Sequence, residues 1–85
     1  MTPEIQYYLD KLQEEAAEVI QAVSKIRRFG PANKKSENHP TNMQEFVGEV
    51  EDFLALLAAL ESTNCIDLTL SQNNIAYKLK QIYRG

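Results

Sequence analysis

An uninterrupted helical pattern in the first third of the chain constrains the fold more than any other feature. No glycine or proline occurs between Pro3 and Gly30. Apolar residues recur through this stretch every three or four positions, which is the spacing of one face of an α-helix. Thr2 is a favourable N-cap, Pro3 suits the first helical position, and Gly30 followed by Pro31 would end the helix. The sequence therefore predicts a long helix over residues 3 to 28.

A second helix is predicted after a polar loop. Residues 31 to 41 are rich in turn-forming residues and show no apolar periodicity, so we expect a loop there. Thr41 or Asn42 can cap the helix that follows, and Glu45 lies near the third helical position, which completes a capping box. The apolar stripe of this helix continues to about Ser62.

A third, weaker helix is predicted to start at Asp67 or Thr69, and no period-two strand pattern appears anywhere in the chain. We therefore expect an all-α fold of about three helices, organised as one domain over residues 1 to 85. Residues 53 to 60 are apolar almost all the way round their helix, which a monomer would not leave in contact with water. This segment predicts that homo-oligomerisation completes the helical bundle.

Composition narrows the classes of function. The net charge of -3 argues against a dedicated nucleic-acid partner, because such proteins usually carry a positive excess. The longest apolar run is far shorter than the roughly 20 residues that cross a bilayer. Cys65 is the only cysteine, so no intrachain disulfide forms, and we expect it to be a small buried residue. The first ten residues do not resemble a signal peptide, so we expect a cytoplasmic protein without membrane partners.

Two pairs of acidic residues are the strongest candidates for chemistry. Glu15 and Glu18 lie three positions apart beside the apolar stripe of the first helix, and Glu49 and Asp52 repeat this arrangement in the second. If the two helices pack antiparallel, all four carboxylates converge. So many like charges are costly unless cations neutralise them, and hard oxygen ligands on rigid helices suit magnesium. These four residues are the predicted metal ligands.

A solvated acidic face is the competing interpretation. With 12 acids in 85 residues, chance alone would give roughly one to two acidic pairs at a spacing of three. Helical ion pairing with Lys11 and Lys25 also explains some of the acids. Their position at the core boundary of both helices favours the metal site. A di-iron carboxylate bundle would require Glu-x-x-His pairs, and His39 lies in the polar loop, so we set that class aside.

Several short blocks carry a resemblance to a known family. The stretch from Leu12 to Ala22 reads LQEEAAEVIQA, and the stretch from Glu49 to Leu56 reads EVEDFLAL. With Asn42 and the segment from Tyr77 to Lys80, these blocks resemble the MazG-like all-α nucleoside triphosphate pyrophosphohydrolases. That family carries Glu-x-x-Glu on one helix and Glu-x-x-Asp on the next. The chain departs from the family pattern at Glu51, where a glycine is common.

The resemblance implies a helical bundle assembled as a dimer or tetramer. It also implies magnesium-dependent hydrolysis of nucleoside or deoxynucleoside triphosphates to monophosphate and pyrophosphate, as in the cleansing of nucleotide pools. A carboxylate-oriented water would attack the α-phosphorus, and Glu14 and Glu15 are the candidate catalytic residues. The candidate substrate-binding residues are Lys25, Arg28, Asn42 and Lys78. The alternative function is a non-enzymatic helical module that binds a partner protein.

Overall fold

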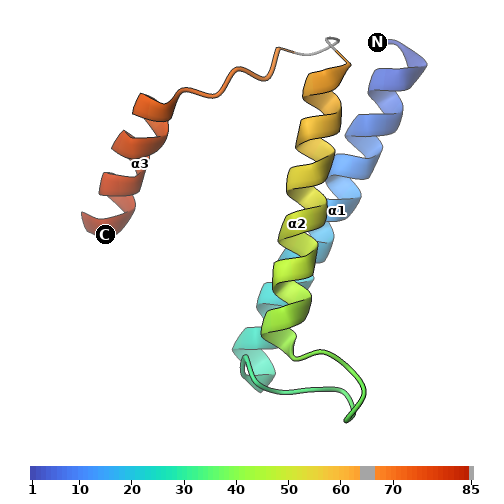
Figure 1. Cartoon of the computed structure of the whole chain (residues 1–85), viewed down its shortest axis with the longest axis vertical. Coiled ribbons are helices and arrows are strands. Elements are labelled where there is room, and N and C mark those ends of the chain that lie inside the picture. The colour runs from blue at the N-terminus through green and yellow to red at the C-terminus, as the bar shows by residue number, and fades with distance from the viewer. Residues whose placement is uncertain (64–66, 85) are drawn as a thin grey trace.

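The computed structural model describes residues 1–63 and 67–84, which form three α-helices and no strand. Helix α1 spans Pro3–Phe29, α2 spans Asn42–Ser62 and α3 spans Gln72–Arg84. Helices α1 and α2 pack side by side as an antiparallel hairpin, and α3 lies apart from them (Figure 1). The all-α, three-helix prediction is confirmed.

The ends of α1 follow the predicted capping residues. The Thr2 hydroxyl accepts a hydrogen bond of 3.2 Å from the backbone N–H of Ile5. At the other end, Gly30 adopts a positive φ of 90°, and its N–H donates to the carbonyl of Ile26 at 2.8 Å. A glycine adopts this backbone conformation without the steric cost that a Cβ atom imposes. The helix therefore continues one residue beyond the predicted end, to Phe29.

The start of α2 uses a capping box with a different partner from the one expected. Thr41 is the N-cap, and its hydroxyl accepts a hydrogen bond of 3.1 Å from the Gln44 N–H. The Gln44 side chain accepts in return from the Thr41 N–H at 2.8 Å. The prediction of Glu45 in this position is wrong, because Thr41 as the cap makes Gln44 the third helical residue. Glu45 is free to pair with Lys25 instead.

Asn42 joins the two helices at the loop end of the hairpin. It is only 7% exposed, and its side-chain amide donates to the Gly30 carbonyl at 3.0 Å. Its backbone N–H donates to the Asn33 carbonyl at 2.9 Å, beside an isolated β-bridge between Lys34 and Thr41. Asn42 is thus the first residue of α2, and its side chain is hydrogen-bonded to Gly30, the residue that ends α1. These bonds explain why Asn42 is buried, and no bound substrate is needed to explain it.

We therefore expect Asn42→Ala to destabilise the hairpin by about 1 kcal/mol, because a partly buried carbonyl loses its donor. Urea unfolding followed by circular dichroism measures this loss. Asn38→Ala, at an exposed position in the same loop, is the matched control. Equal stability of the two variants would show that the Asn42 amide does not support the fold.

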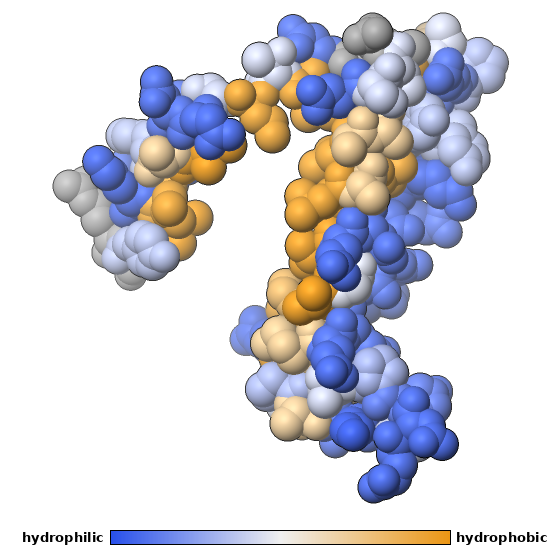
Figure 2. Space-filling view, viewed as in Figure 1, coloured by the Kyte–Doolittle hydropathy of each residue, from blue (hydrophilic) through white to orange (hydrophobic). Residues whose placement is uncertain are grey.

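The core of a single chain is thin. Among the described residues, only the apolar side chains of Ala22 and Leu60 are buried, at 5% and 2% exposure. Figure 2 shows apolar surface along one side of α2, outside its contact with α1. Residues 53 to 60 include both buried and exposed side chains. Leu60 is buried, whereas Leu54 is 57% exposed. Homo-oligomerisation remains a prediction.

Helix α3 begins later than the sequence predicted. It starts at Gln72, and the Ser71 hydroxyl accepts a hydrogen bond of 3.2 Å from the Asn74 N–H. The predicted starts at Asp67 and Thr69 are wrong, because the Thr69 hydroxyl donates to the Asp67 carboxylate, and neither residue lies in the helix.

Cys65, which was predicted to be a small buried residue, lies outside the described residues. Within residues 1–63 and 67–84, no helix is long and apolar enough to cross a membrane.

Candidate metal centre

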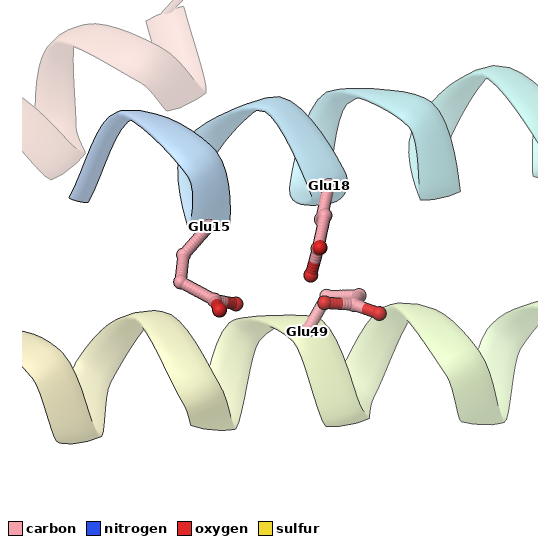
Figure 3. A group of neighbouring side chains, drawn as sticks. All are labelled: Glu15, Glu18 and Glu49. Atoms are coloured by element: carbon pink, nitrogen blue, oxygen red, sulfur yellow. The ribbon is translucent and has the colours of Figure 1, made fainter. Parts of the chain in front are cut away.

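Three of the four predicted metal ligands meet between α1 and α2. Glu15 and Glu18 project from α1, and Glu49 projects toward them from α2 (Figure 3). One carboxylate oxygen from each residue lies within 4.8 Å of the others. The antiparallel hairpin produces this meeting, because it sets the middle of α1 beside the first half of α2. The predicted convergence is confirmed for these three side chains.

Two of these carboxylates carry oxygens that lack a partner. All three side chains are half-buried. One oxygen of Glu15 and one of Glu49 are shielded from solvent and accept no hydrogen bond from the described residues. A buried carboxylate oxygen without a donor is costly, so such atoms are usually paired or bound to a cation. The arrangement offers hard oxygen ligands without an internal donor to neutralise them.

The like charges also alter proton binding at the site. Partial burial raises the pKa of Glu15 above its usual 4.5, and the charges of Glu18 and Asp52 raise it further. For Glu49, the hydrogen bond that a protonated carboxyl would share with Glu18 is the largest cause of a raised pKa, followed by partial burial and the neighbouring charges. A proton is therefore held more tightly in the folded chain than in the unfolded chain. A metal cation would compete with this proton for the same oxygens.

These raised pKa values predict how stability changes with pH when divalent cations are absent. The tighter proton binding of Glu15 and Glu49 stabilises the folded chain fully at a pH below 4.5, their pKa in the unfolded chain. This stabilisation is lost as the pH rises through their higher pKa values in the folded chain. These two groups should make the metal-free protein melt at a lower temperature at neutral pH than at a pH below 4.5. Glu49→Gln should flatten this dependence. Thermal melts of both proteins in chelator test it, and parallel curves would contradict the predicted coupling.

Asp52 lies near the three glutamates but outside their group. Its side chain is exposed, and it lines a pocket with Glu15, Lys11, Ala55 and Leu56. Its negative charge acts on Glu15 and Glu49, whose pKa values it raises. In this chain Asp52 therefore contributes to the potential of the site, and its predicted role as a direct metal ligand remains a prediction.

A second pocket of about 250 Å³ adjoins the glutamates on the side toward the loop. Glu18 and Glu49 line it together with Lys25 and Gln21. The Lys25 ammonium pairs with the Glu45 carboxylate at 3.4 Å, and it is more than half exposed. A cation and an amide thus lie beside the carboxylates, and Glu45 lines the same pocket. Lys25 was predicted from the sequence as a residue of this site, whereas Gln21, which lies one helical turn after Glu18, was not.

Lys11 was also missed as a residue of the site. It lines the pocket with Glu15 and Asp52, and its ammonium lies 3.6 Å from the Glu14 carboxylate. Its position in the sequence could have indicated this, because Lys11 lies one turn before Glu15 on the same face of the helix. Glu14, a predicted catalytic residue, is exposed and does not belong to the group of three glutamates. Its carboxylate acts on the site by raising the pKa of Glu15.

The remaining candidate residues lie away from the glutamates. Arg28 is exposed, and its guanidinium carbon lies 5.1 Å from the centre of the Phe29 ring. Lys78 lies on α3, which makes no contact with α1 or α2 in the described part of the chain. Asn42 is bonded to the end of α1. A single chain therefore does not bring these predicted substrate-binding residues to the site.

Comparisons with protein families, with characterised proteins and with solved structures found no match to this chain. The resemblance to the MazG-like pyrophosphohydrolases consequently rests on the sequence blocks alone. The geometry of Glu15, Glu18 and Glu49 is an observation about this chain, whatever its family.

Proposed function

We propose that this protein is a magnesium-dependent hydrolase that converts nucleoside triphosphates to monophosphates and pyrophosphate. The observation that supports it is the meeting of Glu15, Glu18 and Glu49, with two shielded oxygens that no donor satisfies. The resemblance of the flanking sequence to MazG-like enzymes supplies the class of substrate. A role in clearing nucleotide pools within the cytoplasm follows from that resemblance.

The donor set fits magnesium. Carboxylate oxygens are the ligands this ion prefers, and it usually takes the rest of its shell from water and substrate phosphates. Glu15, Glu18 and Glu49 would hold it, with Asp52 at the edge of the site. When bound, magnesium supplies positive charge that neutralises phosphate oxygens as they approach the acidic helices.

Other residues of the chain would bind the triphosphate and orient the attacking water. Lys25 and Gln21 line the pocket beside Glu18 and Glu49, so we propose that they bind oxygens of the triphosphate. Glu15 also faces the opposite pocket with Lys11, so a water that enters this pocket would lie beside its carboxylate. We assign Glu15 this role of orienting the attacking water. Glu14 would act indirectly, by holding the Lys11 ammonium at the rim of the pocket.

A non-enzymatic interaction module is the second candidate. The exposed apolar residues on α2 and the isolated α3 favour it, because such surfaces usually bind another protein. This candidate requires no metal and no nucleotide. A homo-oligomer of two or four chains is compatible with either function, so the oligomeric state alone does not separate them.

A panel of nucleoside triphosphates, each incubated with and without magnesium, tests the proposed function. We expect pyrophosphate, with little orthophosphate, from at least one substrate, and only when magnesium is present. A chelator should stop the release. Absence of turnover across the panel, by a protein that is folded and oligomeric, would favour the interaction module instead.

A further inference from the structure

Helix α3 is an amphipathic helix without a partner helix in the described part of its own chain. It makes no contact with α1 or α2, and all its residues from 72 to 83 are exposed. Ile75, Leu79 and Ile82 are spaced by four and three residues, so they lie on one face. An isolated helix of 13 residues is only marginally stable in water, since most helical stability in proteins comes from packing an apolar face. Helix α3 therefore needs a surface to pack against.

The outer face of α2 offers a matching surface. Met43, Val47 and Leu54 are 42%, 48% and 57% exposed, and their spacings of four and seven residues place them on one face. Ile75 and Ile82 on α3 are seven residues apart, as are Val47 and Leu54 on α2. In Figure 2 the apolar surface of α2 lies on the side toward α3, and the apolar surface of α3 lies on the side toward the hairpin.

The charges of the two faces are complementary. No acidic residue follows Asp67, so α3 carries only basic charges, and Lys78 borders its apolar face. Glu51 is exposed between Val47 and Leu54 on the outer face of α2. This places an acid within the apolar stripe of α2 and a base beside that of α3.

The dimensions of the chain leave enough exposed surface for a second copy to supply the missing contact. Its radius of gyration is 16.0 Å, whereas a compact chain of this length has about 12 Å. Its accessible surface is 6960 Å², and a compact monomer of this mass exposes about 5,100 Å². The excess is ample for a standard interface, which buries about 800 Å² on each partner.

We propose that two copies of this chain exchange their third helices, so that α3 of each packs on the outer face of the other copy's α2. The segment from 67 to 71 contains no helix and runs as an arm away from the hairpin (Figure 1). It holds α3 apart from its own α2, with its apolar face free to receive the partner. This exchange does not depend on the proposed hydrolase activity, because it uses neither the glutamates nor the pockets beside them.

An isotope-mixing experiment tests the exchange directly. Full-length chains with a photoreactive leucine analogue at position 79 are prepared unlabelled and nitrogen-15 labelled, then mixed in denaturant and refolded. After illumination, mass spectrometry identifies the peptides joined to α3. We expect α3 to be joined to α2, with many pairs containing one labelled and one unlabelled peptide. Isotopically uniform α3–α2 pairs would show packing within one chain, and absence of α3–α2 pairs would show another interface; either result overturns the proposal.

Matched substitutions provide an independent readout. Val47→Asp and Leu79→Asp each place an acid at an exposed position, so neither should unfold the hairpin. We expect both to halve the sedimenting mass at micromolar concentration. Tyr77→Asp, on the opposite face of α3, is the control and should sediment like the unmodified chain. If the unmodified chain is a monomer, or if all three variants retain its mass, the exchange is wrong.

Discussion

Replacing Glu49 with glutamine is expected to abolish magnesium-dependent hydrolysis while leaving the helices intact. The substitution removes one of the three converging carboxylates but preserves the size of the side chain. We expect turnover to fall by on the order of 10²-fold or more, which is the scale of losing one preorganised group at a reacting centre. Glu18→Gln should have the same effect. Pyrophosphate release measures the loss, and circular dichroism reports the helical content.

The same variants should be at least as stable as the unmodified protein when metal is absent. The glutamates repel one another, and a neutral amide at either position relieves this repulsion. Glu61→Gln, at an exposed position near the end of α2, is the control and should retain activity. If Glu49→Gln or Glu18→Gln unfolds the metal-free protein, these acids are structural and the assignment of a metal centre is wrong.

Magnesium and a non-hydrolysable nucleotide together are expected to stabilise the protein more than the sum of their separate effects. Three carboxylates should bind the ion weakly by themselves and more tightly when phosphates complete its shell. A ligand that binds only the folded state at a hundredfold excess over its dissociation constant adds about 2.7 kcal/mol. Melting curves with metal, with nucleotide and with both measure this synergy.

Glu18→Gln should lose the synergy and Glu61→Gln should keep it, because only the first removes a carboxylate from the site. Asp52→Asn separates the two roles open to Asp52. A direct ligand predicts loss of synergy, whereas a contribution to the potential alone predicts a partial reduction. Purely additive shifts in the unmodified protein would contradict a shared site for metal and nucleotide, and the interaction module predicts that result.

The sequence predicted the hairpin well because local signals define it. Thr2, Pro3 and Gly30 set the limits of α1 to within one residue, and the stripe of α2 ended at Ser62 as expected. The meeting of Glu15, Glu18 and Glu49 was also predictable. Helical periodicity places each on the inner face of its helix, and antiparallel packing leaves few other arrangements for them.

Features that depend on competition between neighbouring residues were not predictable from pattern alone. Thr69 bonds to Asp67 and does not cap α3, so the helix starts at Gln72. The position of Asp52 outside the group of glutamates depends on the rotation of α2 against α1. The separation of α3 from the hairpin could not be anticipated either, because helical periodicity identifies an apolar face without identifying what covers it.

The most direct measurement is hydrolysis of a nucleoside triphosphate in water labelled with oxygen-18, with magnesium present. Attack at the α-phosphorus places the solvent oxygen in the monophosphate and leaves pyrophosphate unlabelled. We expect this result for the unmodified protein, and on the order of 100-fold less product, or none, for Glu49→Gln. Label in orthophosphate or pyrophosphate, or equal turnover by the two proteins, would contradict a pyrophosphohydrolase centred on these three glutamates.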